Sequence, residues 1–222
     1  NRLMKIYNEI KLAQELIRFP TVKTEDWGIM KFLSRKLSSI GFRCKIIKSK
    51  GIGPKSALNL YAKFGKSKPH INFLGHTDVV ANLSNWKIPP FKAVIKKGFL
   101  NGRGSQDMKG GIACWISAVS NFIKNNKFKG SISIIISADE ETTGYGCPAV
   151  MKYLRKKGEK IDFSIVGEPS SNKSVGDEIR IGRRGSMNGI ITVYGKSGHS
   201  AFLGSYINPC TALAKVISKL KS

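Results

Sequence analysis

A histidine and an aspartate, His76 and Asp78, lie two residues apart directly after the apolar run of residues 71–74. A run of this kind, closed by a glycine, is typical of a buried strand whose end delivers both side chains to the edge of a sheet. A carboxylate beside a histidine can fix the tautomer of the ring and make its other nitrogen a better metal ligand. For this stretch alone, a strand that ends in an ordinary polar turn is the alternative interpretation.

Further carboxylates follow two other predicted strands. Glu140 and Glu141 come directly after one apolar run, and Glu168 comes shortly after another. Asp107 stands before a predicted helix, where the helix dipole favours a negative charge. In open α/β sheets, ligands bind beyond the carboxyl ends of the strands, so we expect these side chains to converge.

The set combines one imidazole with several carboxylates, which suits zinc, cobalt or manganese. The carboxylates exceed the needs of one ion, so we expect two metal ions with one carboxylate bridging them. Two neighbouring ions can activate a shared water and polarise a carbonyl, and one glutamate of the adjacent pair would be free to act as general base. The chain has only 14 Asp and Glu against 38 Lys and Arg, so several acids at strand ends are not expected of solvated surface charge.

Apolar periodicity predicts the elements that must position these residues. Helices are predicted over residues 6–17, 26–40, 109–123 and 148–157, and strands over residues 43–48, 58–64, 71–74, 132–136 and 163–166. In the first helix, the spacing predicts a buried face of Ile6, Ile10, Ala13 and Ile17. A hairpin is predicted to turn at Lys97-Gly98. The alternation predicts an α/β domain with a mostly parallel sheet flanked by helices.

The pattern changes near Arg180. Strands are predicted over residues 179–182 and 187–194 with no helix between them, and Asn208-Pro209 begins a last helix. We therefore expect a first domain over residues 1–180, which holds the metal site, and a second, smaller domain that starts in residues 181–222.

The formal net charge of +24 raises nucleic-acid binding as another class of function. The lysines are spread along the whole chain, and no basic stripe with interleaved aromatic residues is present, so we do not expect nucleic acid as a partner. A coding bias would give the same excess of lysine, and a basic surface also attracts small anions. The scattered cysteines and the absence of a long apolar run predict reduced thiols, no membrane span and a cytoplasmic protein.

Six motifs follow one another along the chain: GHTDVV, the WxxPPF of residues 86–91, GRGxxDMKGG, the SxDEE of residues 137–141, GEPSS and GRRGS. Together they resemble the co-catalytic zinc family of aminoacylases and carboxypeptidases over nearly the whole chain. The resemblance implies a zinc-exopeptidase-like catalytic domain, the start of a smaller α+β dimerisation domain, a homodimer, and hydrolysis of a linear amide in a small anionic N-acyl amino acid.

Within the family, GEPSS followed by GDxxxxGRRGS is most similar to members that split N-succinyl-LL-2,6-diaminopimelate into succinate and LL-2,6-diaminopimelate, a step of lysine and cell-wall synthesis. Deacetylation of acetylornithine, or another aminoacylase activity of the same family, is the alternative within the enzymes. A basic nucleic-acid-binding protein or a truncated, non-catalytic remnant is the alternative from another class.

The resemblance also implies a role for each candidate metal ligand. His76 would bind the first of two ions, zinc or cobalt, with Asp78 behind it. Asp107 would bridge both ions, Glu168 would complete the first set, and Glu141 would bind the second ion.

Three further residues have roles implied by the resemblance. Glu140 would be the general base. Arg183 would hold a substrate carboxylate, since a guanidinium suits a planar, two-point contact. His199 would reach the neighbouring subunit's site and stabilise the developing oxyanion. For Arg183 the alternative is an exposed basic residue, and for His199 it is a turn residue. Residues 202–205 depart from the sequence that the family usually has after this histidine.

The second metal site of the family uses another histidine from a C-terminal portion. The three histidines of this chain are His70, His76 and His199, and His70 matches no motif, so we expect it on the surface. We therefore expect a truncated chain: either the N-terminal portion of a working hydrolase, completed by the same gene or by a second chain, or a decayed product that holds at most one ion well.

Overall fold

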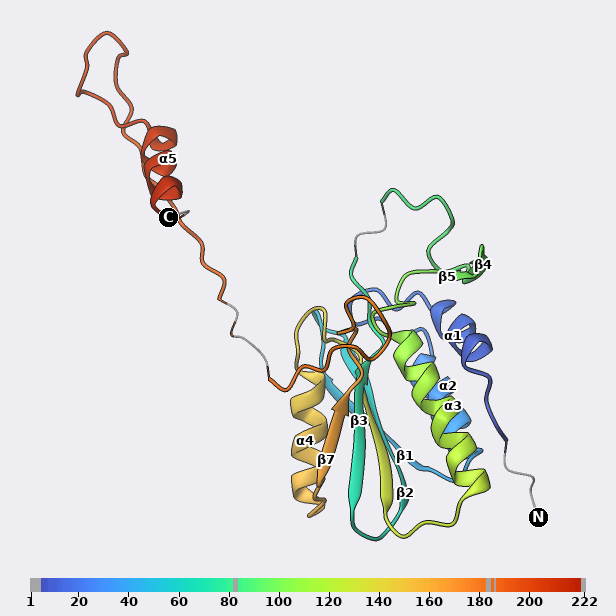
Figure 1. Cartoon of the computed structure of the whole chain (residues 1–222). Coiled ribbons are helices and arrows are strands. Elements are labelled where there is room, and N and C mark those ends of the chain that lie inside the picture. The colour runs from blue at the N-terminus through green and yellow to red at the C-terminus, as the bar shows by residue number, and fades with distance from the viewer. Residues whose placement is uncertain (1–4, 82–83, 183–184, 186, 221–222) are drawn as a thin grey trace. The chain divides into compact units, whose positions relative to one another are not determined.

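The computed structural model describes residues 5–81, 84–182, 185 and 187–220. The chain divides into two compact units, Asn1–Glu178 and Ile179–Ser222. The first unit contains a sheet covered by helices, and the second contains one helix and an extended segment (Figure 1).

The first unit is built on a five-stranded sheet in the order β1-β2-β6-β3-β7. The strands are β1 (Arg43–Lys50), β2 (Ser56–Gly65), β3 (His70–His76), β6 (Ser131–Ser137) and β7 (Phe163–Val166). β3 is parallel to both β6 and β7, whereas β1 with β2 and β2 with β6 are antiparallel. The predicted α/β fold is confirmed, but the sheet is mixed and not mostly parallel. A loop as short as residues 51–55 joins β1 to β2, and a connection of that length allows only antiparallel pairing.

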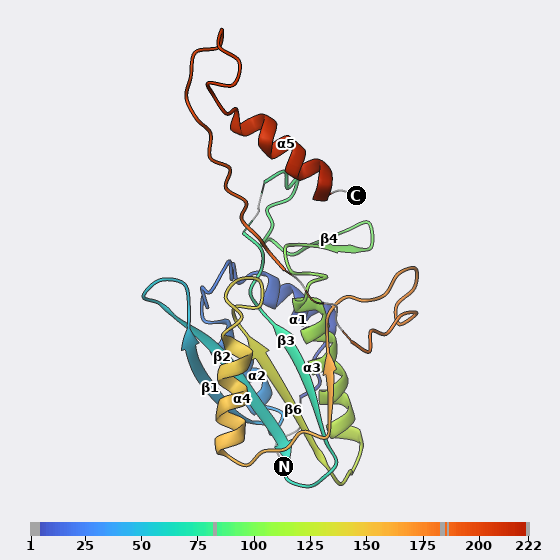
Figure 2. The ribbon, with the colours of Figure 1, turned by 90° about the vertical axis from the view of Figure 1, so that its left-hand side faces the viewer.

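Helices cover both faces of this sheet (Figures 1 and 2). The helices α1 (Glu9–Ile17), α2 (Ile29–Ser38) and α3 (Lys109–Asn125) lie on one face, and α4 (Gly146–Lys156) lies on the other. Side chains alternate across a strand, so Ile134 of β6 joins the core under the three helices while Ile135 packs with Val150 and Leu154 of α4. The two faces of β6 therefore bind the layers together, and the helices and strands predicted for this unit are all present with small shifts at their ends.

The first helix differs from its prediction in where it begins and which face is buried. The side chain of Asn8 accepts a hydrogen bond from the Lys11 N–H at 2.9 Å, so α1 begins at Glu9 and not at residue 6. Ile6 and Ile10 are 44% and 49% exposed. The buried face consists of Leu12, Ala13, Leu16 and Ile17.

The predicted hairpin is confirmed between β4 (Val94–Lys96) and β5 (Phe99–Asn101). Its two turn residues, Lys97 and Gly98, have φ angles of 51° and 79°. A positive φ at both positions is the geometry of a type I′ turn, whose twist matches that of the flanking strands.

The second unit contains the helix α5 (Pro209–Leu220), which Asn208 caps by accepting the Cys210 N–H at 2.9 Å. The strands predicted over residues 179–182 and 187–194 are wrong, since these residues are irregular in the structure. The only pairing among the described residues of this unit is one bridge between Lys196 and Ile207. A strand needs a partner for its backbone groups, and Ile181 and Ile190 are fully exposed here. In the described part of the chain, no helix is long and apolar enough to cross a membrane.

Because one face of the sheet is buried under α1, α2 and α3, we expect substitutions at two isoleucines of this sheet to cost very different free energies of unfolding. Ile134→Ala removes a side chain that is 0% exposed, and we expect it to lower the free energy of unfolding by about 2–5 kcal/mol. The matched change Ile165→Ala, at a β7 residue that is 52% exposed, should cost within about 0.5 kcal/mol. Urea unfolding followed by circular dichroism measures both, and equal losses would contradict this core.

Candidate metal centre

The carboxyl ends of three neighbouring strands meet at one edge of the sheet. In the parallel register, His76 of β3 lies opposite Ser137 of β6, and Leu74 lies opposite Val166 of β7. The residues that follow each strand therefore enter the same region, as expected for a ligand site in an open α/β sheet.

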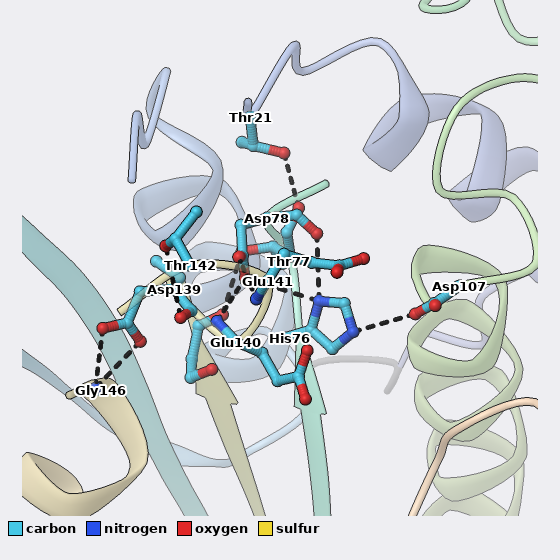
Figure 3. Close-up of polar contacts among 12 residues, drawn as sticks. Thr21, His76, Thr77, Asp78, Asp107, Asp139, Glu140, Glu141, Thr142 and Gly146 are labelled. Carbon is cyan, nitrogen blue, oxygen red and sulfur yellow. Dashed lines mark hydrogen bonds and ion pairs between the residues drawn. The ribbon is translucent and has the colours of Figure 1, made fainter. Parts of the chain in front are cut away.

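His76 is the centre of a cluster of ligand atoms. Its ring is 2% exposed, and its Nε2 lies 3.0 Å from Asp107 Oδ1 and 3.6 Å from Glu168 Oε1. Figure 3 shows Asp107 pointing at the ring. One ligand atom from each of these three residues lies within 4.8 Å of the others. An imidazole nitrogen and two carboxylate oxygens are donors that zinc and cobalt accept, so the donor set fits a divalent cation.

Two of these ligands remain open to solvent. The side chains of Asp107 and Glu168 are 49% and 37% exposed, so an ion could reach them. A cavity of about 380 Å³ has both Asp107 and Glu141 in its wall. The guanidinium of Arg103 stacks 5.2 Å from the ring of Trp86 in the same wall. Glu141, the predicted second-ion ligand, therefore shares a cavity with the predicted bridging residue.

The charges at this edge shift the pKa values of two groups. Burial alone would lower the pKa of His76, but the neighbouring carboxylates of Asp78 and Glu168 raise it to about 11. Burial raises the pKa of Glu141, and the negative charge of Asp107 raises it further. The ring of His76 thus retains a proton that a cation would replace.

Asp78 contacts the residues after β6 as well as His76. Its Oδ1 accepts the backbone N–H of Glu140 at 3.1 Å, and its Oδ2 accepts that of Glu141 at 2.9 Å. The ring Nδ1 of His76 lies 3.0 Å from the backbone oxygen of Asp78 and 3.5 Å from its Oδ1. Sequence reasoning placed Asp78 behind His76 and gave no indication of the two backbone contacts, because they join segments about sixty residues apart.

Asp139 was not singled out from the sequence, although it precedes the two glutamates. It is 0% exposed, and its carboxylate accepts the N–H groups of Tyr145 and Gly146 at 2.8 and 2.9 Å and the hydroxyl of Thr143 at 2.7 Å. These N–H groups lie at the start of α4, where a carboxylate satisfies free donors and the helix dipole. Its position shortly before a predicted helix was the only available signal.

The burial of Lys109 was also missed, because lysine is usually exposed; its place in GRGxxDMKGG was the available signal. It is 0% exposed, and its Nζ donates to the backbone oxygen of Phe19 at 2.7 Å. Burial lowers the pKa of Lys109 to about 7, although the charge of Asp78 opposes this shift.

Of three other sequence predictions, the structure leaves two untested and contradicts one. Arg183 lies outside the described residues. His199 belongs to the second unit, where it is exposed and its Nδ1 accepts the Ala201 N–H at 3.1 Å, so its role stays a prediction. His70 is not a surface residue: it is 2% exposed, and its ring nitrogens lie 2.8 Å from Lys160 O and from Ser133 Oγ. The ring is held at the start of β3, at the opposite end of that strand from His76.

The fold and the cluster define an α/β protein with a candidate divalent-metal site beyond the carboxyl ends of its strands. Residues 73–217 match peptidase family M20/M25/M40, and the chain belongs to this family.

Similar sequences carry one name. The chain is 48% identical to succinyl-diaminopimelate desuccinylase of Pelagibacter ubique, over 98% of this chain and 58% of the relative. It is 44% identical to the enzyme of the same name from Ehrlichia canis, over 96% of this chain and 57% of the relative. The chain thus spans a little over half the length of these relatives.

Solved structures agree on the fold. A tripeptidase from Staphylococcus aureus matches with a TM-score of 0.65 at 18% identity, over 96% of this chain and 57% of that chain. Human carnosine dipeptidase 1 matches with a TM-score of 0.61 at 21% identity, over 71% and 37%. An M20 family metallo-carboxypeptidase from Sulfolobus solfataricus matches with a TM-score of 0.58 at 20% identity, over 73% and 37%.

The raised pKa of His76 predicts how metal binding depends on pH. A metal ion binds the neutral imidazole, so an ion that binds well below a pKa of about 11 must displace a proton. The apparent affinity for Zn²⁺ should therefore rise about tenfold per pH unit near neutrality if one proton is released. Calorimetric titrations in buffers of different ionisation enthalpy measure this release. An affinity independent of pH, or the same release in His76→Ala, would contradict the assignment.

Proposed function

We propose that this chain carries the metal-binding part of a hydrolase that splits N-succinyl-LL-2,6-diaminopimelate into succinate and LL-2,6-diaminopimelate. The observation that carries the proposal is the convergence of His76, Asp107 and Glu168 from three separate segments. The name shared by relatives at 44–48% identity supports the substrate, and it favours this reaction over acetylornithine deacetylation. The activity is proposed for the whole protein, because the chain spans only 58% of the first relative.

The proposal assigns the ligands of two divalent ions, zinc or cobalt. His76 and Glu168 would hold the first ion, Glu141 would hold the second, and Asp107 would contribute to both. Its support is that Asp107 belongs to the His76 cluster and also lies in the cavity wall with Glu141. When bound, the ions would polarise the amide carbonyl and favour ionisation of the attacking water.

Glu140 is proposed as the general base. It is exposed at the same edge of the sheet, next to Glu141, and its backbone is held by Asp78. Glu140 takes a proton from the water as the new C–O bond forms at the carbonyl carbon. It then gives the proton to the amine nitrogen as the C–N bond breaks, so that an acid and an amine are released.

Substrate binding is proposed to use charge. The substrate is an anionic N-acyl amino acid, and the net charge of +24 gives a field that attracts it. Arg183 would hold one carboxylate by a two-point contact, and His199 would stabilise the oxyanion in the partner's site of a homodimer. In this proposal, residues 1–180 form the catalytic portion and residues 181–222 begin the dimerisation domain.

The proposed base predicts a variant that separates metal binding from chemistry. Glu140→Gln keeps the shape of the side chain but cannot accept the proton. We expect it to retain the metal content of the wild type and to lower kcat by about 10²–10⁴-fold. Metal analysis by mass spectrometry and a succinate-release assay measure the two effects. The control is Glu25→Gln, at an exposed residue paired with Lys55, and it should change neither quantity. Loss of metal in Glu140→Gln would contradict its assignment as the base.

The proposed function is tested by metal uptake and by a substrate panel. The purified chain is titrated with Zn²⁺ and Co²⁺, and the loaded protein is then given N-succinyl-diaminopimelate and N-acetylornithine. Uptake that depends on His76 and Asp107 supports the site, and its absence would overturn the site. Faster turnover of N-acetylornithine than of the succinyl substrate would overturn the proposed substrate.

A further inference from the structure

The two glutamates with proposed roles in the second ion site and in proton transfer belong to a short segment after β6, which we call the acidic loop (residues 139–141). We propose that Asp78 is a positioning residue for this loop, and that its carboxylate sets the directions of Glu140 and Glu141 through their backbone N–H groups. The inference rests on the proposed function for the roles of the glutamates, but its contacts do not depend on it.

The contact between Asp78 and the acidic loop is made by both carboxylate oxygens. Oδ1 accepts the Glu140 N–H at 3.1 Å and Oδ2 accepts the Glu141 N–H at 2.9 Å, from a side chain that is 1% exposed. Hydrogen bonds from backbone N–H groups to a carboxylate are shorter and stronger than those between neutral groups. Because two consecutive N–H groups point at one carboxylate, the peptide unit between the glutamates cannot rotate without breaking a bond (Figure 3).

The carboxylate of Asp78 is further from His76 than from the loop. The ring Nδ1 of His76 lies 3.5 Å from Asp78 Oδ1 but only 3.0 Å from the backbone oxygen of the same residue. A backbone oxygen remains in place when the side chain is replaced. The orientation of His76 therefore has a support that does not need the carboxylate, whereas the bonds from the two loop N–H groups end on the carboxylate oxygens themselves.

Asp139, the first residue of the acidic loop, fixes the loop by contacts with the residues that follow it. Its carboxylate accepts the N–H groups of Tyr145 and Gly146 and ties the loop to the start of α4. The ends of β3 and β6 are also joined, since the Thr77 N–H donates to the Ser137 oxygen at 3.0 Å. Two buried carboxylates thus fix the segment that carries Glu140 and Glu141: Asp78, which follows β3, and Asp139, which follows β6.

This arrangement links the two proposed ion sites through a residue that binds neither ion. Asp78 lies two residues after His76, the last residue of β3, and accepts the backbone N–H of Glu141, so a change at Asp78 should disturb the second site without removing a ligand. Asn at this position offers one acceptor oxygen and an NH₂ group, which would face one of the two N–H donors. We expect the loop to lose at least one of its two bonds in Asp78→Asn.

Amide hydrogen exchange of the ¹⁵N-labelled chain tests the inference directly. In the wild type, the Glu140 and Glu141 amides should be protected. In Asp78→Asn their exchange should be faster by about tenfold or more, while the Tyr145 and Gly146 amides keep their protection. The matched control is Asp162→Asn, whose carboxylate accepts the His70 N–H at 2.8 Å at the other end of β3. It should leave the Glu140 and Glu141 amides unchanged.

Two results would overturn the positioning role: unprotected Glu140 and Glu141 amides in the wild type, or unchanged exchange in Asp78→Asn. The first needs no variant, so it remains decisive if Asp78→Asn fails to fold. The link to metal is tested by Co²⁺ titration followed by absorption. Asp78→Asn should weaken uptake by about 10–100-fold, as loss of a residue that orients ligands does, and unchanged uptake would overturn the link. If the wild type takes up no Co²⁺ but its Glu140 and Glu141 amides are protected by Asp78, the proposed function fails and the positioning contact stands.

Discussion

The parallel pairing of β3 with both β6 and β7 is the constraint on which the site depends. Parallel neighbours end at the same edge, so whatever follows them in sequence is brought together in space. The antiparallel strands β1 and β2 extend the sheet on the other side of β6 and add no ligand. They provide instead the surface against which α2 and α4 pack, which stiffens the sheet behind the site.

Carboxylates that lie close together repel one another, and the local structure must offset this repulsion. Six of the 14 acidic residues of the chain gather around this edge: Asp78, Asp107, Asp139, Glu140, Glu141 and Glu168. The structure does so in two ways. Asp78 and Asp139 are buried and accept hydrogen bonds from backbone N–H groups, whereas Asp107, Glu141 and Glu168 stay partly exposed around a histidine of raised pKa. An external cation can reach the oxygens of this second group and those of the exposed Glu140.

Apolar periodicity was enough to predict the helices and strands of the first unit, and the acids after β3, β6 and β7 were enough to indicate a metal site. Periodicity cannot show pairing between distant segments. It therefore did not predict the antiparallel half of the sheet, the burial of His70 or the hydrogen bonds between Asp78 and the acidic loop. In α1, the cap at Asn8 sets where the helix begins, and the buried face includes Leu12 and Leu16 in place of Ile6 and Ile10. In the second unit, apolar residues at strand-like spacing had no neighbouring strand to pair with, and the predicted strands are absent from its described residues.

The start of α4 limits which sequences can keep this loop. Gly146 donates to Asp139, and a Cβ added at this position would collide with the side-chain oxygens of both Asp139 and Asn59. Asn59 in turn holds the Ala138 N–H at 3.2 Å and the Ile47 oxygen at 3.2 Å. Even alanine at position 146 would displace Asn59 and Asp139, whose hydrogen bonds connect β1, the residues after β6 and the start of α4. Glycine is therefore demanded here by lack of space and not by backbone conformation, so a single added methyl group is enough to displace the side chains of Asp139 and Asn59.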